Sequence, residues 1–318
     1  MEFLEKSLKP HIERIDAIIH EAFQSDVRLI RAIGDHLSLP GGKRIRPAMT
    51  VLAAQACGRP IDQDLLNVAA GVEVFHMATL LHDDVIDNAT QRRGRTSVNA
   101  QWSDNAAILM ADYLFARAFD LTLAAANSRI LSLLCQVTRQ MVEGEMLQIE
   151  REGRLMTREE YFGIIERKTA ALFSACAQIG GMVAKAEPAV VASLGQFGLN
   201  FGMAFQITDD TLDFAAESRN WGKPVGGDIA NGKQTLPLIY ALETATREDR
   251  ASLLKLLSNG RDFSRILEHV RKYNGLDHAR QVARDFADRA TRCLDGWTAQ
   301  GTSERFLELC SYVVNRAY

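Results

Sequence analysis

The sequence contains little cysteine, and none of it in a pattern typical of a disulfide framework or a zinc site. Its 318 residues include five cysteines, an odd number, and no two of them have the C-x-x-C spacing. A disulfide-rich secreted domain and a structural zinc module are therefore excluded. The five thiols are expected to be reduced, as they are in cytoplasmic proteins.

An excess of charge and a long apolar run are also missing. The 37 Lys and Arg residues nearly balance the 40 Asp and Glu residues, whereas a nucleic-acid-binding protein usually carries a basic excess. The most apolar stretches, 68–81 and 170–184, are interrupted by polar residues or glycine and fall short of the roughly 18 apolar residues of a membrane span. We expect a soluble, cytoplasmic protein with no nucleic-acid partner and no integral membrane segment.

Proline is absent from two long tracts. None of the seven prolines lies between Pro60 and Pro188, and none follows Pro237. Because proline breaks a helix interior at a cost of about 3 kcal/mol, these tracts permit long helices. Apolar residues recur every three to four positions over residues 64–87, 108–125, 130–149 and 159–183 of the first tract, and over residues 191–214 beyond Pro188. With no period-two alternation and no flexible linker, the sequence predicts an all-α fold and a single domain over residues 1–318.

What the sequence does have is two acidic motifs of the form D-D-x-x-D, each directly after an apolar helical stretch. The first spans residues 83–87 and the second spans residues 209–213. Residues four apart lie on one helix face, and the helix dipole disfavours anions near a helix C-terminus. Such carboxylates call for a cation, and Mg²⁺ prefers one or two carboxylates together with substrate phosphates. The motifs lack the spacing of an EF-hand calcium loop.

Basic residues accompany these motifs along the chain. Arginine binds phosphate oxygens in a bidentate fork, and lysine supplies a mobile point charge. The basic residues in question are Lys43, Arg44, Arg46, Arg92, Arg93, Arg167, Lys168, Lys223 and Lys233. Together with two magnesium-type motifs, they predict a diphosphate substrate.

The order and spacing of these motifs resemble those of the trans-isoprenyl diphosphate synthases. The segments that carry the resemblance are 41–47, 80–87, 92–94, 144–148, 168–170, 205–213 and 222–237. Nearly the whole chain is covered, and the bacterial octaprenyl-type polyprenyl diphosphate synthases are the most similar group. The resemblance implies one large antiparallel helical bundle around a deep central cavity, and a homodimer.

The resemblance also implies a function. The protein would be a magnesium-dependent prenyltransferase that condenses isopentenyl diphosphate onto an allylic diphosphate such as farnesyl diphosphate. The product would be a long all-trans polyprenyl diphosphate for quinone side chains. About three Mg²⁺ ions per active site would bridge the allylic diphosphate to the two motifs.

The resemblance assigns roles residue by residue. Asp83, Asp87 and Asp209 would bind the metal directly, and Asp84, Asp210 and Asp213 would bind it directly or through water. The allylic diphosphate would contact Arg92, Lys168 and Lys233, with Lys223 nearby. The diphosphate of isopentenyl diphosphate would contact Lys43, Arg46, His76 and Arg93. Thr169 and Gln206 would line the reacting end.

The expected chemistry follows from charge. Metal and basic residues stabilise the departing diphosphate, and the double bond of isopentenyl diphosphate attacks the allylic cation that remains. Dipoles of Thr169 and Gln206 steady that cation. No side-chain base is evident, so the released diphosphate is expected to accept the proton. His82, beside Asp83, is interpreted as a packing residue in preference to a catalytic one.

Product length is predicted from residues just before the first motif. Ala78 and Thr79 are small and lie about one helical turn before Asp83, where an aromatic side chain closes the cavity in short-chain relatives. The channel should therefore continue deeper and accept a product of about eight isoprene units. Its release should be slow, because the apolar tail favours the buried channel over water at about 0.8 kcal/mol per CH₂, and we expect transient membrane contact during release. Candidates for the floor, left unranked, are Leu134, Cys135, Thr138 and Met141.

Four alternatives stay open at this point. A shorter-chain farnesyl or geranylgeranyl synthase would share every motif. A class I terpene cyclase would normally carry an Asn/Ser/Glu motif in place of the second D-D-x-x-D. A non-catalytic subunit of a heteromeric synthase should have lost some of these residues, and a structural metal-binding protein would not need the basic set.

Overall fold

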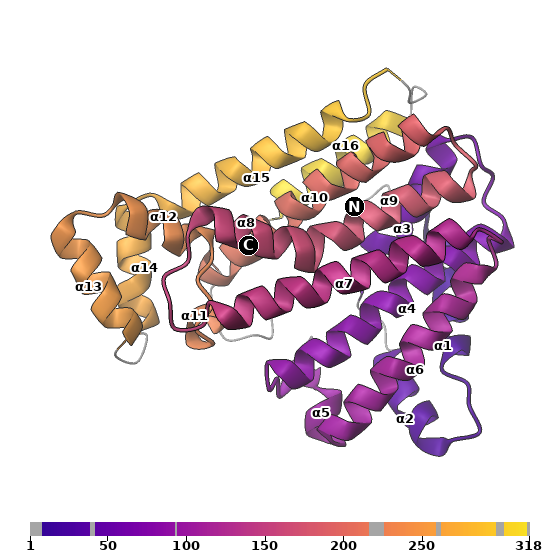
Figure 1. Cartoon of the computed structure of the whole chain (residues 1–318), viewed down its shortest axis with the longest axis horizontal. Helices are drawn as coiled ribbons and strands as arrows, with labels where there is room; N and C mark the ends of the chain where they lie inside the picture. The colour runs from indigo at the N-terminus through magenta and orange to yellow at the C-terminus, as the bar shows by residue number, and fades with distance from the viewer. Residues whose placement is uncertain are drawn as a thin grey trace. The chain divides into compact units, whose positions relative to one another are not determined.

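The predicted all-α fold class is confirmed by the computed structural model, which describes residues 8–38, 42–92, 94–215, 226–258, 262–296 and 302–316. Within these residues, β-structure is limited to one antiparallel pair of two-residue strands. The elements, of which Figure 1 labels the helices α1 to α16, are α1 (Lys9–Ala22), α2 (Arg28–Leu37), α3 (Ile45–Ala56), α4 (Gln63–Ile86), β1 (Gln91–Arg92), β2 (Arg95–Thr96), α5 (Val98–Gln101), α6 (Asp104–Leu123), α7 (Ser128–Glu150), α8 (Arg158–Ile165), the π-helical segment η2 (Glu166–Ala170), α9 (Ala171–Val183), α10 (Pro188–Ala215), α11 (Gly227–Ala230), α12 (Leu236–Thr244), α13 (Arg247–Ser258), α14 (Phe263–Lys272), α15 (Gly275–Arg292) and α16 (Thr302–Val314).

Internal contacts divide the chain into two compact units. Unit 1 contains residues 1–135, 175–195 and 296–308, and unit 2 contains residues 136–174, 196–295 and 309–318. The first aspartate motif belongs to unit 1 and the second to unit 2. The single domain over residues 1–318 stays a prediction, and each unit is described by itself.

Unit 1 is organised around α4, which is apolar on all sides. Every residue from Val68 to Ala78 is buried, as expected for a helix without a polar face. The helix begins at the N-cap Asp62, whose carboxylate accepts the Leu65 N–H at 3.0 Å. Helix α6 packs along α4, and the ring of Phe75 meets that of Phe115 edge-on with centroids 5.1 Å apart. This packing fixes the helix that ends in the first motif.

Apolar clusters hold together the described part of unit 2. One joins α8, η2 and α10 to α12 and α15, with Ile165, Ile207 and Ile239 among its buried residues. Another joins the end of α10 to α12, α13 and α14, and includes Phe214. Close approach of helices within the unit depends on Gly198, where an added Cβ would lie 2.4 Å from the carbonyl oxygen of Phe173. These contacts fix the helix that carries the second motif.

The predicted helices agree with the structure, with one internal difference. The apolar stretches 64–87, 108–125, 130–149 and 191–214 correspond to α4, α6, α7 and α10, with ends displaced by a few residues. The stretch 159–183 is not one α-helix, because the five residues of η2 separate α8 from α9. Apolar spacing does not distinguish a π-turn from an α-turn, since one extra residue per turn leaves the same face buried.

Among the residues that the structure describes, two helices are long and apolar enough to cross a membrane by length and composition alone. They are α4 and α10, and 78% and 50% of their most apolar windows are buried inside the structure. The buried core helices of soluble proteins pass the same test. The absence of a membrane-spanning segment stays a prediction.

Candidate active site

The first aspartate motif forms the C-terminal end of α4. Asp84 is 2% exposed, whereas Asp83 is half-buried and Asp87, the C-cap residue, is exposed. The short β1–β2 hairpin places Arg92 against the motif, and its Nε donates to Asp84 Oδ1 at 2.6 Å. Arg92, predicted to bind the allylic diphosphate, therefore neutralises a motif carboxylate in this structure. Arg93 lies outside the described residues.

His82 makes the contacts of a packing residue. Its ring lies 5.7 Å from that of Phe115 on α6, and Nε2 is 3.7 Å from Asp112 Oδ1. These contacts agree with the interpretation of His82 as a packing residue.

The residues predicted to hold isopentenyl diphosphate belong to unit 1. Lys43 is exposed just before α3, Arg46 is half-buried in the first turn of α3, and His76 is buried on α4. Thr79, one of the two predicted chain-length residues, donates from its hydroxyl to the His76 carbonyl at 2.8 Å. Ala78 is fully buried.

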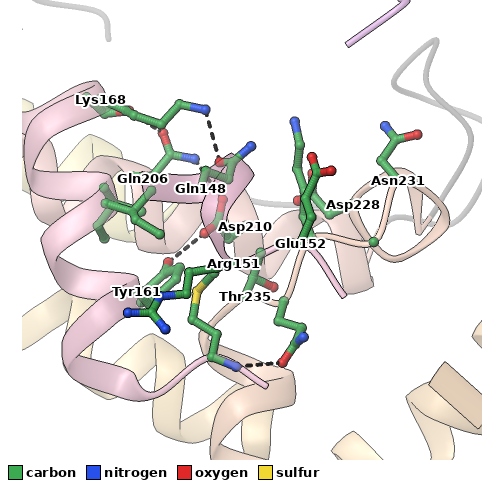
Figure 2. Close-up of a pocket in the computed structure, with 17 residues that line it drawn as sticks. Gln148, Arg151, Glu152, Tyr161, Lys168, Gln206, Asp210, Asp228, Asn231 and Thr235 are labelled. Carbon is green, nitrogen blue, oxygen red and sulfur yellow. Dashed lines mark hydrogen bonds between the residues drawn. The ribbon is translucent and has the colours of Figure 1, made fainter. Parts of the chain in front are cut away.

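The second motif borders a cavity of about 150 Å³ in unit 2 (Figure 2). Its lining comes from the end of α7, from α8, η2 and α10, and from residues 228–235. The structure brings five of the predicted site residues together here: Lys168, Thr169, Gln206, Asp210 and Lys233. Lysine ammonium groups and carboxylates thus share one concave site.

Asp210 is the most buried carboxylate of the second motif, and neutral side chains hold it. Tyr161 donates its hydroxyl to Asp210 Oδ2 at 2.5 Å, and Gln206 donates its amide to Oδ1 at 2.7 Å (Figure 2). Burial, and next the charge of Asp228, raises the pKa of the Asp210 carboxyl well above its usual range despite these hydrogen bonds. A carboxylate in such surroundings gains strongly from a nearby cation.

Lys168 and Thr169 lie on the π-helical segment η2. The Lys168 ammonium donates to Gln148 Oε1 at 3.0 Å and forms an ion pair with Glu145, both on α7. The Thr169 hydroxyl donates to Gln206 Oε1 at 2.8 Å. π-Helical turns are rare and are frequent at functional sites, and here the turn places both side chains on the cavity.

Gly144 explains how α7 approaches η2 closely. A Cβ at this position would lie 2.8 Å from the Lys168 Cγ, so a larger residue would displace the lysine stem. The segment 144–148 was noted in the sequence as a motif, and the structure shows its local function: a small residue for close packing, followed by the lysine partners Glu145 and Gln148.

Asp213, the last aspartate of the second motif, is hydrogen-bonded to the chain that follows α10. Asp213 Oδ2 accepts the backbone N–H of Asp228 at 3.0 Å. The Lys233 backbone N–H in turn donates to the Asp228 carbonyl at 2.8 Å, which fixes the base of the Lys233 side chain beside the cavity. Lys223 lies outside the described residues.

The comparisons decide the family. The chain matches the family of polyprenyl synthetases over residues 27–273. This chain belongs to the polyprenyl synthetase family. The octaprenyl diphosphate synthase of Escherichia coli (strain K12) is 36% identical over 306 residues, which cover 95% of this chain and 94% of that protein.

Two further relatives of this polyprenyl synthetase bear on its activity. A short chain isoprenyl diphosphate synthase of Methanothermobacter thermautotrophicus is 34% identical and covers 98% of each chain. The crystal structure of a polyprenyl synthase from Caulobacter crescentus CB15, complexed with calcium and isoprenyl diphosphate, has a TM-score of 0.93 at 35% identity, and covers 100% of this chain and 98% of that one.

The resemblance seen in the sequence is therefore confirmed, and the protein is an enzyme, a prenyltransferase of the polyprenyl diphosphate synthase class. Its family uses isoprenoid diphosphates as substrates. The calcium in the related crystal structure is consistent with the use of a divalent metal in this family. Product length, magnesium dependence and the ligand set stay predictions.

The donor set of this polyprenyl synthetase fits magnesium bound together with a diphosphate. Within the described ranges, no group of three or more His, Cys, Asp or Glu side chains is arranged to hold a metal by itself. Mg²⁺ does not require such a cage, because it retains waters and uses one or two carboxylates plus phosphate oxygens. Asp83, Asp87 and Asp209 are hard oxygen donors that reach solvent.

Sequence reasoning missed several residues of the site. Tyr161 holds Asp210 across 49 residues of sequence. Arg316, near the C-terminus, stacks its guanidinium 4.1 Å from the ring centroid of Phe205 and lies 3.8 Å from Asp209 Oδ1. Neither position has a local signal, because a lone tyrosine or arginine is ordinary in composition. Only the fold shows which carboxylate each one faces.

Proposed function

We propose that this polyprenyl synthetase condenses isopentenyl diphosphate successively onto an allylic diphosphate, with Mg²⁺, to give an all-trans polyprenyl diphosphate of about eight isoprene units. The observation that carries the proposal is the cavity of unit 2, where Lys168, Lys233 and the second aspartate motif meet. A site with both lysines and carboxylates suits a diphosphate bound together with a divalent cation.

The lysines act on the leaving group. Lys168 is aligned by Gln148 and Glu145, so its ammonium group is already in position when negative charge develops on the departing diphosphate. Lys233, on the 228–235 stretch of the cavity lining, adds a second point charge. Fixed charges of this kind are effective because they need no reorganisation during the reaction.

The metal, when bound, supplies Lewis-acid stabilisation of the diphosphate oxygens. All six motif aspartates, Asp83, Asp84, Asp87, Asp209, Asp210 and Asp213, belong to the proposed ligand set. Tyr161 and Gln206 orient Asp210 for this role, and Arg92 is proposed to exchange its bond with Asp84 for the allylic diphosphate.

The allylic cation must be stabilised by dipoles that do not attack it as nucleophiles. Thr169 and Gln206 hydrogen-bond to each other and line the cavity, so their oxygen atoms are held in place and can face the cation. With no side-chain base in these motifs, the released diphosphate accepts the proton lost after condensation. Lys43, Arg46, His76 and the undescribed Arg93 are proposed to orient isopentenyl diphosphate.

Product length rests on the small residues before the first motif. The chain is almost equally similar to an octaprenyl synthase and to a short chain synthase. Product length must therefore be inferred from particular residues and not from overall identity. Ala78 and Thr79 offer no aromatic barrier, which supports a long product. Of the floor candidates, Leu134 is fully buried, whereas Cys135 is exposed and is the weakest.

We further propose a cytoplasmic homodimer that contacts membranes transiently to release product. Helix α6 exposes Leu109 and Leu123, and α7 exposes Met146, at 68%, 54% and 59%. Large exposed apolar side chains of this kind support an apolar contact with a second copy or a lipid surface.

The test is product analysis with the purified chain alone. Labelled isopentenyl diphosphate and farnesyl diphosphate should release diphosphate only with Mg²⁺, and the extracted products should be about eight units long. A product of three or four units would favour the short-chain alternative. Activity only after adding a second protein would favour the heteromeric subunit, and a cyclised product would favour the terpene cyclase.

A further inference from the structure

A buried arginine lies between two residues proposed to hold isopentenyl diphosphate. Lys43 is exposed and Arg46 is half-buried, but Arg44 is only 8% exposed. Its Nε donates to Asp16 Oδ1 of α1 at 2.7 Å, and its Nη1 donates to Glu73 Oε1 of α4 at 2.9 Å. One side chain therefore ties the segment before α3 to two helices.

The backbone at Arg44 is held in an unusual conformation. Its φ of 47° and ψ of 39° are left-handed, which is uncommon for a residue other than glycine and persists where the surroundings impose it. Arg44 is the N-cap of α3, and its carbonyl accepts the Ala48 N–H at 3.0 Å. The direction in which Lys43 and Arg46 leave the chain thus depends on how Arg44 is held.

Glu73 connects this arrangement to the face of α4 that carries His76. Glu73 is 4% exposed and His76 is 9% exposed, and residues three apart on a helix are neighbours on one face. A buried carboxylate is costly without a partner, so the Arg44–Glu73 pair strongly favours one placement of the segment relative to α4.

We propose that Arg44 is a positioning residue: by bridging Asp16 and Glu73 it sets Lys43 and Arg46 for one diphosphate group, that of isopentenyl diphosphate. The proposal rests on the proposed function for the identity of that substrate. Arg44 itself does not contact substrate. Its two partners lie 28 and 29 residues away in sequence.

The test compares three variants by steady-state kinetics with each substrate varied separately. Arg44→Lys keeps the charge but loses the rigid fork in which Nε contacts Asp16 and Nη1 contacts Glu73, because an ammonium carries all its donors on one nitrogen. We expect the KM for isopentenyl diphosphate to rise about tenfold, with kcat and the KM for the allylic substrate within about twofold. Glu73→Gln should raise the KM for isopentenyl diphosphate to the same extent. The double variant Arg44→Lys/Glu73→Gln should raise it no further than either single variant, because all three proteins lose the same Arg44–Glu73 pair.

The matched control is Arg59→Lys. Arg59 also joins segments of unit 1, to Asp62 and to the Val183 carbonyl, but it lies outside the 42–46 segment. Its loss should leave all KM values near those of the wild type. If Arg44→Lys lowers only the melting temperature or the active fraction, or raises both KM values equally, the ion pair is merely structural and the proposal is wrong.

Hydrogen exchange separates failure of the proposal from failure of the proposed function. If the wild type does not use isopentenyl diphosphate, the proposed function fails, and the amides of residues 44–50 are then followed with inorganic pyrophosphate. Protection in the wild type that is lost in Arg44→Lys and in Glu73→Gln supports positioning for a diphosphate. Equal protection in all three proteins, or none in the wild type, overturns it.

Discussion

The two aspartate motifs have the same sequence pattern but opposite electrostatic surroundings. In the first motif, the buried Asp84 is paired with a cation, Arg92. In the second, the buried Asp210 is held by the neutral donors Tyr161 and Gln206, with Asp228 adding negative charge. Asp84 is therefore compensated by the protein and Asp210 depends on an added cation, whereas the exposed Asp209 of the second motif lies 3.8 Å from Arg316.

Two copies of one sequence motif can thus have different electrostatic environments. A carboxylate beside an arginine must exchange that partner before it binds a metal, whereas one that neutral hydrogen bonds orient stays in place and lacks a cation to stabilise its charge. We therefore expect the second motif to anchor the metal, and the first to respond to the allylic diphosphate.

The largest effect is expected from removing a motif carboxylate. Asp209→Ala and Asp83→Ala should each lower turnover by about three orders of magnitude, because a misplaced metal no longer stabilises the leaving group. The fold should persist, since a repelling charge is removed. Turnover and circular dichroism measure both outcomes, with Asp277→Ala, an exposed carboxylate on α15, as control. Near-normal turnover in either variant would contradict the assignment of its carboxylate.

The next effect concerns the residues that precede each motif. The fourth residue before the motif is Thr79 in α4 but the aromatic Phe205 in α10, so we expect the growing chain to pass along α4. Ala78→Phe should shorten the product to about three or four isoprene units while sparing the first condensation, since an aromatic ring one turn before the metals caps the channel. Chromatography of the extracted products measures their length. Phe205→Leu should leave it unchanged, and a wild-type product from Ala78→Phe would show that the tail does not pass this residue.

A smaller effect is expected when Asp210 loses one donor. Tyr161→Phe should raise the magnesium concentration needed for half-maximal activity by about tenfold to a hundredfold, as is typical for residues that orient metal ligands. A magnesium titration at saturating substrate measures it, and Tyr240→Phe, which keeps its stacking on His278, is the control. An unchanged magnesium midpoint would remove Tyr161 from the site.

The corresponding change at the first motif should have the opposite sign for the metal. Arg92→Ala removes a cation that competes for Asp84, so magnesium should bind as tightly as in the wild type or more tightly. The KM for the allylic diphosphate should rise about tenfold, because a charge-assisted contact is lost. The same titration and a substrate series test this prediction, and weaker magnesium binding in Arg92→Ala would end the contrast between the motifs.

The smallest effect is on stability. Helix α4 begins at a charged N-cap, Asp62, whereas α10 begins at Pro188. Asp62→Ala should cost about 1 kcal/mol of unfolding free energy at neutral pH. Asp64→Ala, which removes a first-turn charge but no cap, should cost less.

The pH dependence of this cap has a definite sign. Burial favours the neutral carboxyl, but hydrogen bonds from Leu65 N–H and Arg59 outweigh it and lower the pKa of Asp62. The stabilisation is therefore complete above the unfolded-state pKa of about 3.9 and is lost as the pH falls below it. Urea unfolding at pH 7 and near pH 3 should show the difference between wild type and Asp62→Ala shrinking in acid. A constant difference would exclude the charged cap.

Much of the fold and part of the site could be predicted because they depend on local pattern. Helices α4, α6, α7 and α10 follow from apolar spacing and the absence of proline, and D-D-x-x-D is recognisable in five consecutive residues. The grouping of Lys168, Thr169, Gln206, Asp210 and Lys233 was anticipated by resemblance, and the structure places all five on one cavity.

The sequence by itself determined which residues form helices and which helix ends carry carboxylates, because both depend on neighbours within a turn or two. Only the tertiary structure decided that Tyr161 faces Asp210, that Arg44 bridges Asp16 and Glu73, and that a π-turn aims Lys168 at the cavity. Contacts between residues tens of positions apart produce no periodic pattern in the sequence. They are selected by the packing of whole helices, where a polar side chain is stable only beside the one partner that satisfies it.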